Sequence, residues 1–484
     1  MKASEKVYDF IIIGCGPTGS TAATYLARLG YSVMVFERTK FPRQHEGESL
    51  LPFCYPLFKE LGVYDEMKTK FVKKPGVRFL NYTDTQSATY CFQNIITDES
   101  KLSFHVLRSE FDLMLMNNAI KNGAAVMQET KVESVNLKRE DKLVDVVTTD
   151  TEGNKTEWCA RFLIDASGQD TFLAKRSGAK NAYKELDRTA FLTHWEGGEY
   201  TDGLQVGLLQ LVYLNDKKSG WFGVQPVGKD RLSVGLVVNR QYIKEQKKIL
   251  TDKGIKDWQM AFYKQEVEEC AFTRRILANA QIIQPLLIVS DYSYYTEKPW
   301  GDNYALLGDA GKFLDPIFAS GVYLGMNSAK MFAEAIHVKI TEGEEAGAVQ
   351  LEHAYKHING AYELVEKFVN IFYDPNSFNL ADAPPDAESK YKNYETAFSL
   401  VHYLLAGDFF NNYDKYSGFL DMLRNPDQFQ RWRALSRSRP SLNTPTCDSD
   451  FNEIFGDILD ELVPAAPGKE EAHKLVLKGK GQEA

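Results

Sequence analysis

Near the start of the chain, the residues best suited to chemistry are three glycines and an acid. An apolar run at 11–13 leads into Gly14, Gly16 and Gly19, spaced as G-x-G-x-x-G, and Glu37 closes the next apolar run. In this pattern the first glycine permits a tight turn, the second lets the backbone approach a pyrophosphate, and the third lets a helix pack on the strand. The helix N-terminus offers free N–H groups to phosphates, and the Glu37 carboxylate can accept from both hydroxyls of a ribose. Together these features predict a dinucleotide pocket, and hence hydride, electron or oxygen transfer.

Three later segments have the composition of further parts of the same pocket. Arg108 opens a predicted helix and suits an anionic or carbonyl-rich ligand. Asp165 ends an apolar strand just before three small residues, and Asp309 follows another apolar strand after Gly308. An Asp at a strand end is also a common turn former. The order of the segments after the first strand-helix-strand unit is therefore more informative than any one of them.

In this order the segments resemble those of the flavin monooxygenase superfamily of the p-hydroxybenzoate hydroxylase type, where they surround one FAD. The resemblance implies that the carboxylate of Asp309 meets the ribityl chain of the cofactor. We therefore expect FAD to be held by Gly14, Gly16, Thr18, Gly19, Glu37, Arg38, Arg108, Asp309 and Gly321.

A narrower resemblance is carried by residues 42–52, which read PRQHEGESLLP. This stretch closely matches P-R-x-H-x-G-E-S-L-L-P of the flavin-dependent halogenases, especially the branch acting on phenols and carrier-bound aromatics. Residues 71–76, FVKKPG, are similar to the K-x-G element that bears that branch's catalytic lysine, and 189–195 and 315–322 also match. The resemblance runs from about residue 7 to about 375. It implies that reduced flavin, O₂ and chloride or bromide yield hypohalous acid, which a lysine directs to an electron-rich aromatic ring such as a phenol.

We expect Lys74 to be that lysine because it directly precedes the x-Gly of the element, and its neighbour Lys73 is the alternative. Desolvation lowers the pKa of a buried amine from about 10.4, and the neutral amine can be halogenated or can hydrogen-bond hypohalous acid. A single lysine is most often a solvated surface charge, but Lys-Pro-Gly favours a turn aimed inward. Glu48 is interpreted as a base for the phenol or for the lysine proton, the alternative being an acid favoured by a helix N-terminus.

Halide binding is expected at the backbone amides that begin a predicted helix over 322–336, with Ser320 and Gly321 as the binding residues. The alternative for Ser320 is an ordinary helix cap.

The family element W-x-W-x-I-P falls on residues 221–226, where Gly223 and Gln225 replace the second Trp and the Ile. In the family this element walls the passage between flavin and substrate, so a glycine is expected to open space there. The expected substrate pocket comprises Trp221, Gly223, Pro226, Phe372 and Tyr373.

These residues need elements that hold them in place. The first helix is predicted over 20–29, and apolar β-branched runs then alternate with helices until about residue 345, where aromatic, helix-like stretches begin. The predicted fold class is α/β. It comprises a Rossmann-type FAD-binding domain (1–190 and 290–345), an inserted β-sheet substrate domain (191–289) and a mostly helical C-terminal region (346–484).

Composition limits the alternatives. The net charge of −9 over 484 residues argues against nucleic-acid or anionic-membrane partners. Six cysteines without a C-x-x-C pair predict neither a disulfide framework nor a zinc site. No apolar run reaches 18 residues, and the first strand leaves no room for a signal peptide, so a cytoplasmic location is expected.

Two other activities fit the same cofactor pocket. An aromatic hydroxylase would use Gly223 to let substrate reach the flavin, and a flavin reductase like the geranylgeranyl reductases would share the fold. Only a halogenase requires Lys74 to point into a passage from the flavin. Because the chain has no second G-x-G-x-x-G for a nicotinamide, a separate NAD(P)H-dependent flavin reductase is the expected partner, beside an aromatic substrate that is free or carrier-bound.

Overall fold

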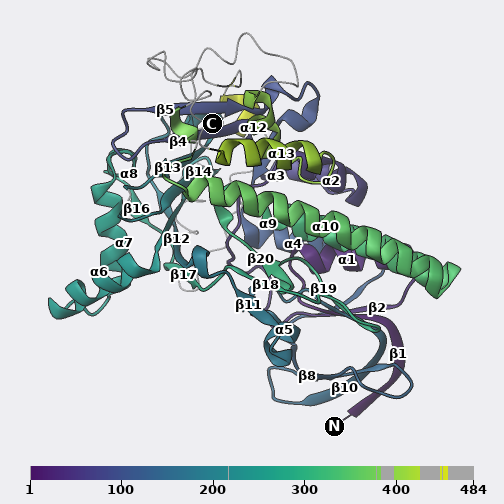
Figure 1. Cartoon of the computed structure of the whole chain (residues 1–484). Helices are drawn as coiled ribbons and strands as arrows, with labels where there is room; N and C mark the ends of the chain where they lie inside the picture. Colours follow the sequence, from purple (N-terminus) through teal and green to yellow (C-terminus); the bar gives the residue numbers. More distant parts are fainter. Residues whose placement is uncertain are drawn as a thin grey trace, which may run out of the picture.

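The computed structural model describes residues 2–215, 217–377, 379–382, 397–425, 447, 449 and 451–455. Two large sheets organise this part of the chain (Figure 1). The first has the order β7-β2-β1-β10-β9-β8, with β19 beside β10. Its strands are β1 (Lys2–Ile13), β2 (Val33–Phe36), β7 (Ala125–Met127), β8 (Lys131–Asn136), β9 (Val144–Thr149), β10 (Lys155–Asp165) and β19 (Tyr304–Leu306).

The C-terminal part of β1, residues 10–13, is apolar on both sides because helices or loops cover both faces of the sheet there. Phe10 and Ile12 pack into the core beneath the helices on one face, while Ile11 and Ile13 pack into a second core with residues of α5. The covering helices are α1 (Pro17–Arg28), α4 (Arg108–Lys121), α5 (Phe172–Ser177) and α9 (Gly321–Glu342). Helix α1 begins three residues earlier than predicted, and Gly30, with φ of 88°, follows its end.

Three strands of the first sheet bring the predicted cofactor segments to one edge. Strands β1, β10 and β19 are parallel, and Asp165 pairs with Ile13 on one side and with Leu306 on the other. Their carboxyl ends therefore open onto the same crevice, the usual position of a ligand in such sheets.

The second sheet has the order β16-β12-β15-β14-β13-β4-β5, with β17 beside β12. Two of its strands, β4 and β5, come from the range 1–190, so this sheet draws on more of the chain than the segment 191–289 predicted for it. Its strands are β4 (Gly76–Leu80), β5 (Ser87–Cys91), β12 (Arg188–Glu196), β13 (Leu209–Tyr213), β14 (Trp221–Gly228), β15 (Arg231–Asn239), β16 (Gln281–Ile282) and β17 (Leu287–Ser290).

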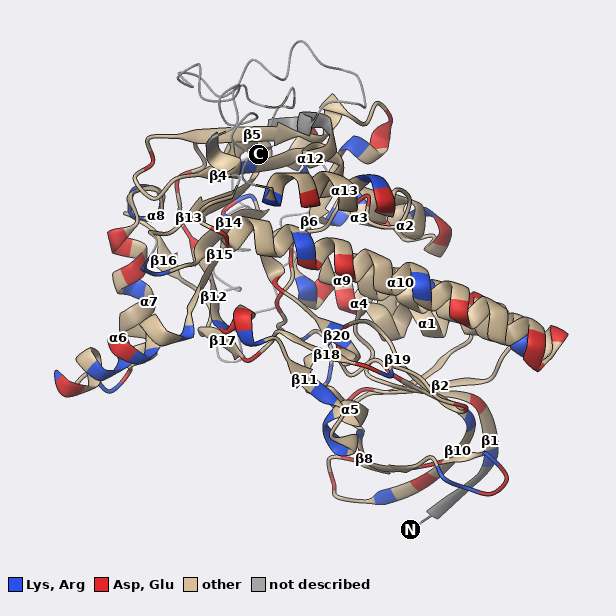
Figure 2. Ribbon diagram, viewed as in Figure 1, with Lys and Arg blue, Asp and Glu red and all other residues tan. Residues whose placement is uncertain are grey.

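One face of the second sheet packs on three helices, which are α6 (Arg240–Asp252), α7 (Trp258–Glu269) and α8 (Ala271–Ile276). Two of them, α6 and α7, carry both acidic and basic residues (Figure 2). Along β14, Phe222 and Val224 enter this core, so the alternate residues face the first sheet. A short antiparallel pair, β3 (Val72–Lys74) and β6 (Ser103–His105), lies at the start of β4.

Helices dominate the described C-terminal residues, as predicted. Helix α10 runs along α9 (Figure 1), and α13 packs against α10. The elements are α10 (Glu344–Tyr373), α12 (Ala397–Ala406), α13 (Tyr413–Arg424) and α15 (Phe451–Phe455). Residues 378, 383–396, 426–446, 448, 450 and 456–484 of the predicted region 346–484 lie outside the described residues. Among the described helices, none is long and apolar enough to cross a membrane. The structure is therefore the α/β fold expected, with a Rossmann-type sheet, a second sheet and a helical C-terminal part.

A disulfide corrects the prediction that the cysteines form none. Cys91, the last residue of β5, is bonded to Cys447, with a sequence separation of 356. Cysteines so far apart carry no spacing pattern, and only the packing of the C-terminal segment on the second sheet brings them together.

Candidate active site

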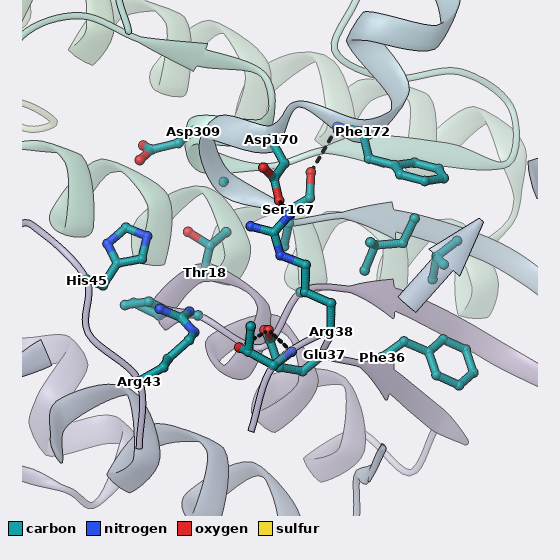
Figure 3. A pocket seen from close by; sticks show the side chains of 18 of the residues that line it. Thr18, Phe36, Glu37, Arg38, Arg43, His45, Ser167, Asp170, Phe172 and Asp309 are labelled. Carbon is teal, nitrogen blue, oxygen red and sulfur yellow. Dashed lines mark hydrogen bonds and ion pairs between the residues drawn. The ribbon is translucent and has the colours of Figure 1, made fainter. Parts of the chain in front are cut away.

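A cavity of about 490 Å³ lies at the edge where β1, β10 and β19 end. Figure 3 shows Thr18, the adjacent residues Glu37 and Arg38, and Asp309 around it, on three separate segments of the chain. All the predicted cofactor residues except Gly19 line this cavity.

The glycines of the first turn differ in what surrounds them. A Cβ atom added at Gly14 would lie 2.5 Å from the carbonyl oxygen of Ala166, and one at Gly19 would lie 2.0 Å from the carbonyl oxygen of Gly14. These two glycines are therefore needed by the protein itself. A Cβ at Gly16 would meet only Arg43 Nη2, at 3.5 Å, so the space it faces is open to a ligand.

The acid at the end of β2 is held rigidly. Glu37 Oε2 accepts from the Cys15 amide at 3.0 Å, and Oε1 accepts from the amide and hydroxyl of Thr39 at 3.0 and 2.7 Å. Its neighbour Arg38 forms an ion pair of 2.5 Å with Asp170 across the cavity (Figure 3). A carboxylate oxygen accepts more than one hydrogen bond, so Glu37 remains suited to ribose hydroxyls.

Two arginines lie at the inner end of the cavity. Arg108 is paired with the buried Asp112 at 2.7 Å and also donates to the Glu46 carbonyl. Arg43 lies 3.3 Å from Asp112, and its buried Nη1 has no partner among the described residues. Because buried donors are almost always bonded, this atom fits a cofactor phosphate. Sequence reasoning quoted Arg43 in the halogenase-like stretch but gave it no role.

The acids of this region are unusually hard to ionise. Burial raises the pKa of Asp309 to about 7, and the nearby Glu46 carboxylate adds to the effect. Burial also raises the pKa of Glu46 to about 7. Gln169 donates to the Glu46 carboxylate at 2.6 Å. The Arg43 donor without a partner among the described residues, the open space at Gly16 and the buried acids Asp309 and Glu46 together fit FAD. When bound, its flavin would react with O₂.

A second, inner cavity of about 140 Å³ adjoins the first. The two share His45, Arg108, Asp309, Gly321 and Val322. The inner cavity extends between the loop at 45–49, the start of α9 and the sheet residues Ala190, Leu192, Leu209, Leu211, Trp221 and Gly223. A cofactor bound along the first cavity would therefore reach the inner cavity at the residues that the two cavities share.

One of the two residues predicted for halide binding lines this junction, and the other, Ser320, directly precedes it in the chain. Gly321 begins α9 and lines both cavities, while Ser320 is buried and its side chain makes no cap hydrogen bond. The preceding residue, Ala319, has φ of 53°, an uncommon conformation outside glycine, so the entry to α9 is held in a constrained shape.

Glu48 lines the inner cavity and is paired with a histidine that sequence reasoning did not single out. Its Oε2 accepts from His194 Nε2 at 3.0 Å, and both side chains are buried. His194 lies on β12 and shares a sheet face with the cavity residues Ala190 and Leu192. The match at 189–195 contained this histidine, but a sequence separation of 146 hides the contact.

Lys74 is 1% exposed, and its Nζ donates to the carbonyl of Leu50 at 3.0 Å. Burial lowers the pKa of this amine to about 7. The amine also lies 5.6 Å from the centre of the Phe92 ring. Lys73, the alternative, is half-buried and donates to the Glu453 carbonyl. Lys74 does not line the inner cavity, and Glu48 pairs with His194 instead of with this amine.

The altered tryptophan element is not open in the way expected. A Cβ at Gly223 would lie 2.9 Å from Cζ3 of Trp221, so the indole of Trp221 already occupies the space beside Gly223. Trp221 Nε1 donates to Tyr373 Oη at 2.8 Å, and Tyr373 donates to the buried Asp315 at 2.9 Å. Helix α10 thus holds the indole in place.

The other predicted pocket residues lie elsewhere. Pro226 is on the face of β14 opposite to Trp221 and Gly223. Phe372 is buried and stacks on Tyr213 with ring centres 4.6 Å apart. Neither lines the inner cavity, which receives Trp221 and Gly223.

Comparison with known proteins agrees with this geometry. Residues 7–357 match the family model described as an FAD binding domain. The flavin-dependent halogenase armH1 of Armillaria mellea is 31% identical over 353 residues, which cover 70% of this chain and 67% of that protein. A 1H-pyrrole-2-carbonyl-[peptidyl-carrier protein] chlorinase of Pseudomonas fluorescens is 28% identical over 398 residues, covering 77% and 85%.

Among solved structures, the myxobacterial chondrochloren halogenase CndH superposes with a TM-score of 0.69 at 29% identity, covering 84% of this chain and 91% of that one. A second halogenase, CmlS, gives a TM-score of 0.69 at 27% identity, with 89% and 78% covered. The fold and the cofactor crevice are those of an FAD-dependent oxidoreductase. The chain belongs to the flavin-dependent halogenase family, and its reaction is FAD-dependent halogenation with a halide as co-substrate.

Proposed function

We propose that this halogenase directs hypohalous acid through Lys74 to an electron-rich aromatic ring, most simply a phenol. The observation that carries the proposal is the complete burial of the Lys74 amine with a pKa near 7. An amine of this kind is about half neutral at pH 7 and can accept a hydrogen bond or take up the halogen. A solvated lysine, with a pKa about three units higher, would be almost fully charged.

The two cavities suggest separate places for the two ends of the cofactor. We assign the outer cavity to the nucleotide of FAD and the inner cavity to the reacting end of the cofactor and to the halide, beside Ser320 and Gly321. Hypohalous acid formed in the inner cavity lies beside Glu48, whose side chain lines that cavity from the loop at 45–49. Lys74 lies just beyond this loop, because its amine contacts the carbonyl of Leu50.

Glu48 is proposed to act as the base in this arrangement, oriented by His194. A carboxylate that accepts from a buried imidazole keeps a fixed direction, which favours proton transfer from a reacting hydroxyl or from the lysine. The Phe92 ring beside the amine gives it an aromatic surrounding, which supports an aromatic substrate.

An aromatic substrate is also supported by the relatives. Their names include a tryptophan 2-halogenase and the carrier-bound pyrrole chlorinase described above. A free phenol and a carrier-bound ring remain the two forms to compare. We further propose that a separate NAD(P)H-dependent reductase supplies the reduced flavin, and that both act in the cytoplasm, where NAD(P)H is generated.

The test is to incubate the enzyme with FAD, a flavin reductase, NADH, bromide or chloride, and a panel of free and carrier-bound phenols and pyrroles. Mass spectrometry should find products with the isotope pattern of the halogen supplied. Oxygenated products formed equally well without halide would contradict the proposal. Halogenation of non-aromatic substrates alone would contradict the substrate class.

The compartment has its own test. Disulfides are uncommon in a reducing cytoplasm. The bond between Cys91 and Cys447 therefore argues against this compartment. Fractionation of the source cells tests the assignment, and recovery of the enzyme outside the cytoplasm would contradict it.

A further inference from the structure

Three buried polar atoms near Lys74 have no hydrogen-bond partner within the described residues. They are Ser49 Oγ, Ser103 Oγ and His105 Nδ1. Their residues are 7%, 3% and 0% exposed. Buried polar groups are nearly always bonded to protein or to an ordered small molecule, so three together call for an explanation.

Strand pairing places these three side chains and the lysine on one face. In the antiparallel pair of β3 and β6, Lys74 lies opposite Ser103, and Val72 lies opposite His105. Ser49 forms a bridge with His105 on the other side of β6. Residues directly opposite each other point to the same side of a sheet, as do residues two apart on one strand. Ser49, His105, Ser103 and Lys74 therefore share one face of a small three-stranded surface.

The histidine presents an acceptor. His105 Nε2 lies 2.9 Å from the carbonyl of Gly207 and must donate to it, which leaves Nδ1 as the unprotonated nitrogen of a neutral ring. Burial, with the nearby charge of Lys74 as a second cause, keeps the pKa of His105 well below its ordinary value. Each serine hydroxyl can donate or accept, so the face offers a fixed acceptor and two adaptable groups next to the amine.

One end of this face opens on the inner cavity. Ser49 lines that cavity, directly after Glu48. At the other end, the amine of Lys74 reaches the carbonyl of Leu50, the residue after Ser49. Ser49 therefore lies between the proposed site of hypohalous acid formation and the proposed acceptor amine, and Ser103 and His105 adjoin it on the same face.

We propose that Ser49, Ser103 and His105 are positioning residues that form a hydrogen-bonding passage for hypohalous acid between the inner cavity and Lys74. Hypohalous acid is small and neutral, donates one hydrogen bond and accepts others, and so matches an unprotonated imidazole nitrogen beside two hydroxyls. Water occupies the passage when the acid is absent. The proposal rests on the role of Lys74 proposed above.

The central test measures where the halogen goes. The variants Ser103→Ala and Ser49→Ala are assayed with a phenol substrate and with a soluble 1,3-diketone that traps free hypohalous acid. In both variants the ratio of halogenated phenol to halogenated trap should fall at least fivefold, and Ser103→Ala, which lines neither cavity, should keep FAD binding and total halide oxidation. The control is Thr149→Val, which removes another buried hydroxyl without a partner, on β9 of the first sheet, and should leave the ratio unchanged. An unchanged ratio in both serine variants would overturn the passage.

A second measurement is independent of turnover. A crystal structure of the resting protein should contain ordered water bonded to Ser103 Oγ and His105 Nδ1, and Ser103→Ala should lose it. A dry, closed face would overturn the proposal. The variants should also melt at or slightly above the temperature of the unaltered protein, because a hydroxyl without a protein partner adds no stability.

Lys74→Ala separates this proposal from the one on which it rests. If Lys74→Ala still halogenates the phenol, the role of the lysine fails. If it loses phenol halogenation and retains the trap reaction, while Ser49→Ala and Ser103→Ala keep the normal ratio, only the passage fails.

Discussion

At the scale of the residue, the burial of Lys74 opposes folding while it favours the proposed chemistry. The unfolded chain keeps this amine protonated up to about pH 10.4, whereas the folded protein releases the proton near pH 7. Between these values the unfolded state binds more protons, so stability rises with pH, and below pH 7 the full penalty applies.

The first prediction follows from this penalty. Lys74→Met keeps the length of the side chain and removes the charge, so it should raise the free energy of unfolding at pH 6 by up to about 4–5 kcal/mol. The gain should shrink as the pH approaches 10, which denaturant titrations at several pH values will measure. Lys73→Met, at a less buried amine, is the control. A loss of stability at pH 6 would show that the amine is charged and paired in the fold.

The second prediction concerns activity. If the neutral amine of Lys74 accepts the halogen or the hydrogen bond, phenol halogenation should increase about tenfold from pH 6 to pH 8, with an apparent pKa near 7. In the variant Lys74→Ala, the halogenation of a trap for free hypohalous acid should not show this increase between pH 6 and pH 8. The comparison is made at saturating reduced flavin, and a flat profile in the unaltered enzyme would contradict the role of the neutral amine.

The third prediction separates cofactor binding from folding. Gly16→Val adds a side chain to open space, so the protein without FAD should keep its melting temperature while FAD binds at least tenfold more weakly. Gly14→Ala meets the carbonyl of Ala166 and has φ of 92°, so it should lower the melting temperature as well. Normal FAD affinity in Gly16→Val would contradict the placement of the FAD phosphates at the Gly14–Gly19 turn.

At the scale of the element, strand β14 shows how one substitution is accommodated by another side chain. Gly223 leaves space that the indole of Trp221 fills, and Tyr373 of α10 holds that indole. A passage widened by glycine is therefore not what the structure contains.

The fourth prediction uses this exchange. Gly223→Trp alone must displace the indole of Trp221 and should cost about 1–3 kcal/mol of stability. Adding Trp221→Gly should recover most of that cost, because the two rings compete for one space. Denaturant unfolding of the four proteins of this double-mutant cycle measures the coupling. Additive effects would mean that the two side chains do not share the space.

The elements also mark the limit of sequence reasoning. The turn at Gly14–Gly19, the strand ends at Asp165 and Asp309, and the helix after Ser320 were predictable because each depends on a local pattern. The pairing of Glu48 with His194 and the place of β4 and β5 in the second sheet depend on contacts between distant segments. The orientation of the Trp221 ring depends on side-chain packing, which no motif encodes.

At the scale of the whole molecule, the bond between Cys91 and Cys447 ties the C-terminal segment to the second sheet. Near it, the Lys73 amine donates to the Glu453 carbonyl, and Ile454 and Phe455 pack on Val72. The described residues of this segment therefore pack on β3, the strand that carries Lys74, and they cover Val72, which lies on the same face of the strand as Lys74.

The fifth prediction tests this connection. A cross-link that closes so long a loop restricts the unfolded chain, so Cys447→Ser should lower the free energy of unfolding by about 2–5 kcal/mol under non-reducing conditions. Dithiothreitol should lower the stability of the unaltered protein to the same level. Cys159→Ser, at a free cysteine, should have little effect. Equal stability with and without reductant would mean that the bond does not constrain the unfolded chain.

The outer cavity has a consequence for how the protein is made. Its lining runs from Ile13, near the start of the chain, to Val322 at the beginning of α9. A ribosome adds about 5–20 residues per second, so about 15–60 s separate the synthesis of the first wall of this cavity from that of the last. Throughout that time the glycine turn exists without the strand end that carries Asp309. Uptake of FAD is thus a late event in the life of the nascent chain, and it favours chains in which the ends of β1, β10 and β19 have already come together.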